Sequence, residues 1–112
     1  MLLSELRAKA QQGTLTFAET IAFIEANYHY QPARLVNGEV VSEPGKNEGS
    51  CKIFAFARLN QLSEAETLQC FGDYYRVDVL QHPDAGDHAN IRQFMKTGWA
   101  GIQFDAQPLT QR

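Results

Sequence analysis

The sequence predicts an α+β fold: a mostly helical single domain with a central buried helix and a small antiparallel sheet, made of a hairpin plus a C-terminal strand. The central helix is predicted by a nearly uninterrupted apolar run that starts at about Cys51. Two capping-box motifs mark other helices, and an Asn-Gly pair between short apolar segments predicts the hairpin. The length suits one unit, so we expect residues 1–112 to form a single domain.

Two helices are expected ahead of the hairpin. Apolar residues recur at helical spacing over residues 2–12, and Gly13 follows as a stop, which indicates a short amphipathic cover helix. Thr16 and Glu19 fit a capping box, and the apolar positions that follow recur every three or four residues. Pro32 ends this second helix.

The hairpin is expected to join residues 34–36 to residues 39–41. The pair Asn37-Gly38 lies between them and is typical of a type I′ turn, which needs a positive φ at both central residues. In this register Leu35 pairs with Val40 across the turn.

A polar loop, residues 43–49, leads from the hairpin to the central helix. Ser50 can accept a hydrogen bond from a free amide of the first turn, so it is the expected N-cap. The helix is apolar on more than one face and must therefore be surrounded by other elements. Its apolar residues are Cys51, Ile53, Phe54, Ala55, Phe56, Ala57, Leu59 and Leu62.

A second capping box, Ser63 with Glu66, starts the next helix, and the apolar pattern continues until Pro83 stops it. Gly72 lies inside this pattern. It either ends one helix and begins another, or it lets a neighbouring element approach closely.

The C-terminal part is expected to contain one more helix and one strand. Asp87 can cap the helix, and Gly98 can end it. Residues 99–104 then alternate in the manner of a strand, which can join the hairpin as its third member.

Charge and composition disfavour several classes of partner. The formal net charge is −3 and no run of Lys or Arg exists, so the attraction that drives binding to nucleic acid or to an anionic membrane is missing. No segment approaches the ~20 apolar residues of a membrane span, and the first residues do not resemble a signal peptide. We therefore expect a cytoplasmic protein whose cysteines, Cys51 and Cys70, are reduced, with no cofactor indicated.

Cys51 is a candidate nucleophile. A thiol at a helix N-terminus, followed by a lysine, is expected to have a lowered pKa, because the helix dipole and the ammonium both favour the thiolate. His88 or His82 follows as a possible base, with Asn90 or Asp105 to orient it, which would make a cysteine-dependent hydrolase or transferase. The alternative is a small buried thiol that packs in the core.

A polar cluster lies between residues 73 and 88 and contains two histidines and several carboxylates. A metal-binding protein could use His82, His88 and Asp87, although their spacing matches no metal motif and no metal ligand is assigned. The alternative is a solvated turn followed by a capped helix.

The leading hypothesis is a non-enzymatic binding or interaction protein, with enzymatic activity left open. Its surface would be built from residues 45–52, 73–76 and 82–88, where polar and aromatic residues gather in connections beside an apolar scaffold. The partner would be a protein or a small molecule, and the sequence does not indicate an oligomeric state. The candidate ligand-binding residues are Asn47, Ser50, Lys52, Asp73, Tyr74 and Arg76.

Four blocks of the sequence resemble a known family. They are residues 47–57, 70–80, 88–92 and 98–101. Through these blocks the chain resembles the HopJ type III effector family over nearly its whole length. The resemblance implies a bacterial protein that a type III system delivers into a plant cell. It implies no catalytic residues, so the candidates above rest on the chain itself.

Overall fold

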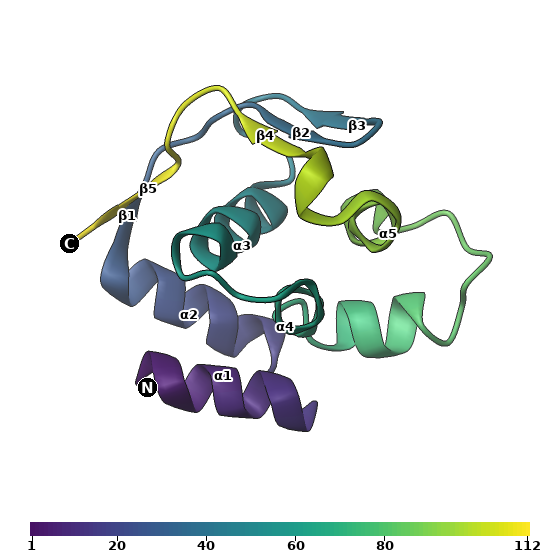
Figure 1. The fold of residues 1–112 in the computed structure, drawn as a ribbon, viewed down its shortest axis with the longest axis horizontal. Coiled ribbons are helices and arrows are strands. Elements are labelled where there is room, and N and C mark those ends of the chain that lie inside the picture. The colour runs from purple at the N-terminus through teal and green to yellow at the C-terminus, as the bar shows by residue number, and fades with distance from the viewer.

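The computed structural model of residues 1–112 confirms the predicted α+β class. The helices are α1 (Leu3–Gln12), α2 (Phe17–Asn27), α3 (Glu48–Leu59), α4 (Glu64–Gln69), the π-helix η1 (Tyr74–Val79), α5 (Ala89–Thr97) and the 3₁₀ turn η2 (Gly98–Gly101). The strands are β1 (Tyr28–Tyr30), β2 (Leu35–Asn37), β3 (Val40–Ser42), β4 (Ile102–Phe104) and β5 (Leu109–Gln111). Helix α3 lies at the centre, with the strands on one side and α2, then α1, on the other (Figure 1).

Helix α3 is buried on all but one narrow face, which confirms the predicted central helix. Its residues Ile53–Ala57 are each no more than 2% exposed. The ring centroid of Phe54 lies 4.9 Å from that of Phe94 in α5. On another side, the centroid of Phe56 lies 5.6 Å from that of Phe23 in α2. Such aromatic pairs stabilise a core by about 0.5–1.5 kcal/mol beyond the area they bury.

Both predicted capping boxes are present. At the start of α2 the backbone amide of Glu19 donates to Thr16 Oγ1 at 3.1 Å, and that of Thr16 donates to Glu19 Oε1 at 3.0 Å. Ser63 and Glu66 make the same reciprocal pair at the start of α4. Gly13, with a φ of 73°, ends α1 as expected.

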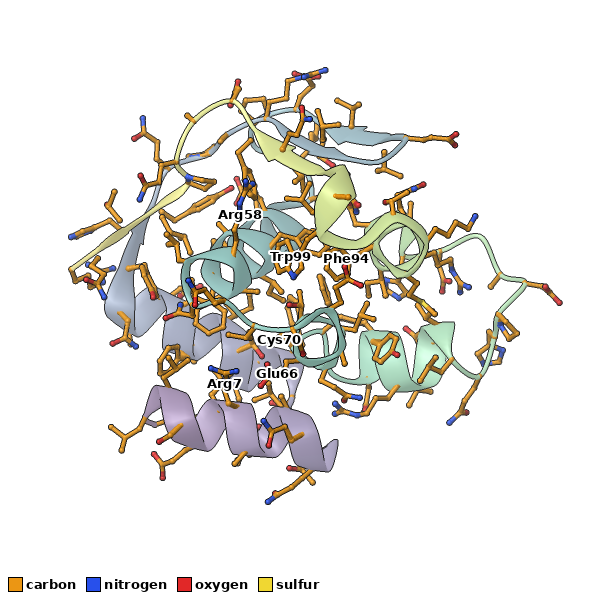
Figure 2. The ribbon with its side chains drawn as sticks, in the orientation of Figure 1. Arg7, Arg58, Glu66, Cys70, Phe94 and Trp99 are labelled. Carbon is orange, nitrogen blue, oxygen red and sulfur yellow. The ribbon has the colours of Figure 1, made fainter.

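An ion pair joins α1 to α4. Arg7 Nε and Nη2 donate to the two carboxylate oxygens of Glu66, each at 3.0 Å, and Figure 2 shows the two side chains facing each other. Glu66 is only 8% exposed. The Arg7 guanidinium is the main cause that lowers the pKa of the Glu66 carboxyl to about 2. This two-pronged contact fixes α1 as a cover over the core.

The strands form two small antiparallel sheets. One has the order β3-β2-β4, so the C-terminal strand joins the hairpin as predicted. Only residues 102–104 of the expected strand are extended, because Gly98–Gly101 forms the 3₁₀ turn. The other sheet, β1 with β5, was not predicted, because strands of three residues are too short to show an alternating pattern.

The predicted register of the hairpin is wrong: the turn lies one residue later in the sequence than expected, so Leu35 pairs with Ser42 and not with Val40. Asn37 pairs with Val40 and lies in β2, and the turn is formed by Gly38 and Glu39, of which only Gly38 has a positive φ, 56°. Asn37 is fully buried, and its amide donates to Asn90 of α5. This tertiary contact outweighs the local preference of Asn-Gly for a turn.

The expected N-caps of α3 and α5 are also wrong. Helix α3 begins after Asn47, so Ser50 lies inside its first turn. Helix α5 begins after His88, while the carboxylate of Asp87 binds Arg92 at 2.7 Å. Both actual N-cap residues, Asn47 and His88, are left-handed, with φ of 49° and 52°, and neither caps its helix with a side chain.

Gly72 combines the two roles that the sequence allowed. It separates α4 from η1 and has a φ of 61°. A Cβ atom built on it would lie 2.6 Å from the backbone nitrogen of Phe17. The start of α2 therefore packs directly against the Gly72 backbone.

We expect Gly72→Ala to destabilise the fold far more than Gly13→Ala. Both glycines are left-handed, which costs Ala about 1–2 kcal/mol. Only Gly72 has backbone in the way, which adds about 1–3 kcal/mol of overpacking. A Cβ on Gly13 meets nothing within 4 Å. Urea denaturation of the two variants measures the difference, and equal losses would contradict the close contact.

Candidate functional site

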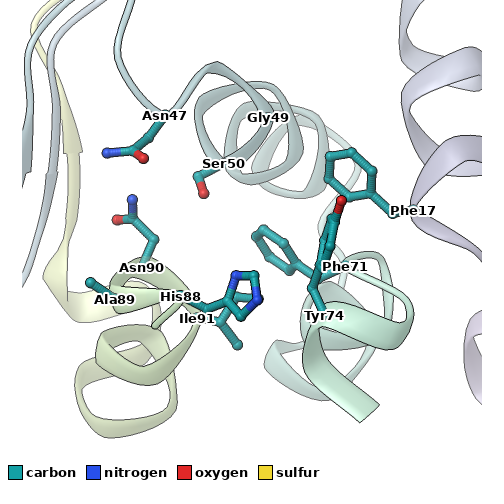
Figure 3. A pocket seen from close by; sticks show the side chains of 10 residues that line it. All are labelled: Phe17, Asn47, Gly49, Ser50, Phe71, Tyr74, His88, Ala89, Asn90 and Ile91. Carbon is teal, nitrogen blue, oxygen red and sulfur yellow. The ribbon is translucent and has the colours of Figure 1, made fainter. Parts of the chain in front are cut away.

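Segments far apart in the sequence meet at one pocket, which we call the helix-start pocket (Figure 3). Its volume is about 230 Å³. The starts of α3, η1 and α5 surround it, and the aromatic side chains of α2 and of the α4–η1 connection complete its wall. The residues that line it are Phe17, Asn47, Gly49, Ser50, Phe71, Tyr74, His88, Ala89, Asn90 and Ile91.

Two helix N-termini face this pocket with free amides. The first backbone bond of α3 runs from Cys51 N to Asn47 O, and that of α5 from Arg92 N to His88 O. The three amides that precede each bond, at residues 48–50 and 89–91, have no partner. A left-handed residue followed by a helical one turns successive N–H groups toward a common point, which suits an anion. The positive ends of both helix dipoles act at the same place.

Three polar side chains face the same space. Asn47 Nδ2 donates to Ser42 Oγ at 2.9 Å, which leaves Asn47 Oδ1 free. The hydroxyl of Ser50 has no hydrogen-bond partner within the protein, and Figure 3 shows it directed into the pocket. Asn90 is 5% exposed and lines the pocket beside Asn47.

An aromatic wall closes the other side of the pocket. The ring of Tyr74 lies 5.0 Å from that of Phe17 in an edge-on contact and 5.0 Å from the imidazole of His88. His88 Nε2 lies 2.9 Å from Asp78 Oδ2, so the carboxylate holds the proton on Nε2 and orients the ring. The pocket therefore has one polar side and one aromatic side.

Four of the predicted site residues meet in this pocket: Asn47, Ser50, Tyr74 and His88. They come from the three segments that the sequence proposed as a binding surface. Sequence reasoning missed the apolar members, Phe17 and Phe71, because aromatic residues at helical spacing are indistinguishable from core. It named Asn90 only as a partner of a catalytic base.

The other predicted site residues lie elsewhere. The ammonium of Lys52 is 4.8 Å from the Tyr30 ring centroid and 3.7 Å from a Glu25 carboxylate oxygen. Arg76 donates to the Leu15 carbonyl and to Gln69, so it connects η1 to the preceding segments.

Two predicted residues remain at the exposed surface. Asp73 is exposed, with a carboxylate oxygen 3.7 Å from an Arg76 guanidinium nitrogen. His82 is exposed in the turn after η1 and does not line the pocket.

The predicted lowering of the Cys51 pKa is wrong. Because α3 begins earlier than expected, Cys51 is its fourth residue and turns into the core, 1% exposed. Its sulfur lies 3.9 Å from the Ala33 carbonyl oxygen, and no imidazole is hydrogen-bonded to it. Burial raises the pKa of the Cys51 thiol, despite a hydrogen bond from Tyr30 that lowers it. Burial likewise raises the pKa of Cys70 to about 12.

A cluster of possible metal ligands lies behind the His88 ring. Ligand atoms of Asp78, Asp87 and His88 all lie within 4.8 Å of one another. An imidazole with two carboxylates suits a divalent cation. The Arg92 guanidinium already binds Asp87 and lowers the pKa of its carboxyl. His82, the other histidine of the sequence hypothesis, is not part of this cluster.

The fold and the pocket define a small α+β protein with a compact polar and aromatic cavity at two helix starts. The family model described as "HopJ type III effector protein" matches residues 2–109, so the chain belongs to the HopJ family. None of its helices combines the length and the apolar character needed to span a bilayer.

A solved structure has nearly the same fold. It is described as "Crystal structure of unknown function protein VPA0580", and it matches with a TM-score of 0.95 and 46% sequence identity. The match covers 100% of this chain and 95% of that one. A comparison with curated proteins found no match.

We expect Cys51 to react slowly with iodoacetamide in the folded protein. A raised pKa leaves less thiolate at neutral pH, and burial blocks access, so labelling should be at least ~10-fold slower than in urea. Mass spectrometry of labelled peptides measures each thiol, with Cys70 as the internal comparison. Fast native labelling of Cys51 that titrates below the ordinary ~8.5 would restore the nucleophile hypothesis.

Proposed function

We propose that this HopJ-family chain is a non-enzymatic binding protein whose helix-start pocket receives a small molecule. The observation that supports this most is the meeting of residues 45–52, 73–76 and 82–88 at one cavity, although they are distant in the sequence. Ligand pockets combine an apolar wall with a few converging polar groups, and this one has both. Its volume of about 230 Å³ restricts the ligand to a small metabolite rather than a peptide.

A binding role accounts for the pocket better than a catalytic one. Covalent catalysis needs a nucleophile within hydrogen-bond reach of a base. Cys51 lies in the core, and the Ser50 hydroxyl makes no hydrogen bond to His88. The His88 ring is instead held by Asp78 as part of the pocket wall.

A second hollow is a weaker candidate. It has a volume of about 360 Å³ and lies between the end of α3 and the β4–β5 connection. Its wall is mostly apolar, and its one charged side chain, Arg58, is directed at the Ile102 carbonyl oxygen, 3.5 Å away. It lacks the converging polar groups that give a ligand its orientation.

The family description adds a further element to the proposal. It names type III effectors, and export of this chain by such a system is proposed on that description alone.

We expect Tyr74→Ala to weaken ligand binding without unfolding the protein, because Tyr74 is 43% exposed yet forms the aromatic wall. Loss of one aromatic contact should reduce affinity about three- to tenfold. The measurement is an NMR screen of small polar metabolites against the ¹⁵N-labelled chain, followed by titration of the compounds that shift Gly49, Ser50 or Asn90.

Val77→Ala is the matched control, since Val77 is on the same π-helix, is 36% exposed and does not line the pocket. Its affinity should equal that of the unmodified chain. Compounds that bind only elsewhere, or that bind Tyr74→Ala equally well, would contradict the proposed pocket.

Metal binding is the second candidate function, supported by the cluster of Asp78, Asp87 and His88. If it is correct, calorimetric titration with Zn²⁺ should show one site, weakened at least ~10-fold by Asp78→Asn through loss of an anionic ligand. Asp84→Asn removes an exposed carboxylate of the neighbouring turn that is outside the cluster, and it should change nothing. Equal affinities of the two variants would exclude this site.

A further inference from the structure

We propose that the helix-start pocket recognises a carboxylate group, which lies between the first amides of α3 and those of α5. The inference rests on the proposed binding function and adds the chemical class of the ligand. The free amides at residues 48–50 and 89–91 supply the donors. A helix start alone would not indicate a ligand, and two further observations do.

The first observation is a side-chain amide donor without a partner, carried by a largely buried residue. Asn37 Nδ2 donates to the backbone oxygen of Asn90 at 2.9 Å and to Asn90 Oδ1 at 3.0 Å. Only a nitrogen can donate to a carbonyl, so the orientation of Asn37 is fixed, and Asn90 must turn its own oxygen toward it. Asn90 Nδ2 then faces the pocket with no hydrogen-bond partner in the protein, on a residue that is 5% exposed. The nitrogen itself is open to the pocket rather than sealed in the core, so it is available to an acceptor that a ligand supplies.

The second observation is the balance of charge around the pocket. Each helix N-terminus is equivalent to roughly half a positive charge, so the two together balance about one negative charge. No Lys or Arg lines the pocket, the Asp78 carboxylate stands behind His88, and Glu48 places a further carboxylate in the first turn of α3. A carboxylate carries one negative charge, whereas a phosphate monoester carries about 1.5 to 2. The pocket therefore suits a carboxylate better than a phosphate.

The rest of the pocket defines the rest of the ligand. The Ser50 hydroxyl, which has no partner in the protein, is a further donor beside the amides. Asn47 Oδ1 is an acceptor on the same side and suits a hydroxyl group of the ligand. The rings of Tyr74, Phe17 and Phe71 cover the opposite side, where an apolar or aromatic body would lie. A small aromatic or hydroxylated carboxylic acid matches these features.

The test compares benzoate with benzamide, which has the same shape and no charge. The ¹⁵N-labelled full chain is titrated with each at constant pH, with sodium chloride as the salt control and inorganic phosphate as the dianion. We expect benzoate to shift the amides of Gly49, Ser50 and residues 89–91 with a Kd on the order of 1 mM, as suits so small a probe. Benzamide should bind at least ~10-fold more weakly.

Two variants locate the carboxylate. Asn90→Asp keeps the oxygen that accepts from Asn37 and replaces the free donor by an anionic oxygen, so benzoate binding should fall at least ~10-fold. Ser50→Ala removes only an unpartnered hydroxyl, so it tests the same site even if Asn90→Asp folds poorly. We expect it to reduce the affinity for benzoate about threefold to tenfold. Ser4→Ala, an exposed serine of α1, is the matched control.

Each outcome decides one point. Equal binding of benzamide and benzoate in the pocket would overturn the carboxylate inference and leave the proposed small-molecule pocket intact. Tighter binding of phosphate than of benzoate would also overturn it, in favour of a dianion. Benzoate shifts that sodium chloride reproduces, or that Ser50→Ala and Asn90→Asp leave unchanged, would show that these amides do not recognise a carboxylate. Failure of the proposed function itself is shown separately, by the metabolite screen with Tyr74→Ala.

Discussion

The near-complete burial of α3 is the constraint on which the rest of the structure depends. Because Ile53–Ala57 lie inside the core, the elements around α3 must supply apolar surface on nearly every side of this helix. Helices α2 and α4 and strand β5 all contact it. A helix enclosed in this way can meet polar groups or water only at its ends, and its first amides have no partner inside the helix. The N-terminal end of α3 is therefore the natural place for a polar pocket in this fold, and α5 brings a second helix start to the same place.

An aromatic cluster packs α5 against α3. Phe54 of α3, Phe94 of α5 and Trp99 of η2 pack together, with ring centroids 4.9, 6.4 and 5.1 Å apart, and Figure 2 shows Phe94 and Trp99 side by side. Trp99 Nε1 donates a hydrogen bond to the Leu62 carbonyl oxygen, which joins η2 to the connection between α3 and α4. A pocket whose walls are already packed in place costs less ordering entropy when a ligand binds.

The features that were predictable from the sequence are those that local chemistry decides. The capping boxes at Thr16 and Ser63 and the stop at Gly13 depend on residues a few positions apart, and they are present. The turn at Asn37 was misplaced because its side chain bonds across the fold to Asn90, which no local pattern contains. The left-handed residues that begin α3 and α5 were missed, so both helix starts were misplaced. Cys51 is buried, as the alternative to the nucleophile hypothesis expected. The site segments could be named from the sequence, whereas their convergence on one cavity required the tertiary structure.

Strand β1 has no partner until residues 109–111 are available, because β5 is the strand that it pairs with. The paired residues, such as Tyr30 and Leu109, are far apart in the sequence, and β2, which pairs with β3 on one edge, pairs with the distant β4 on the other. On a ribosome, the capped N-terminal helices can form early, since their contacts are local. The pairings of β1 with β5 and of β2 with β4 join segments far apart in the sequence, so we expect them to form late in folding. Until they form, the edge of β1 and the β4-facing edge of β2 are open to other molecules.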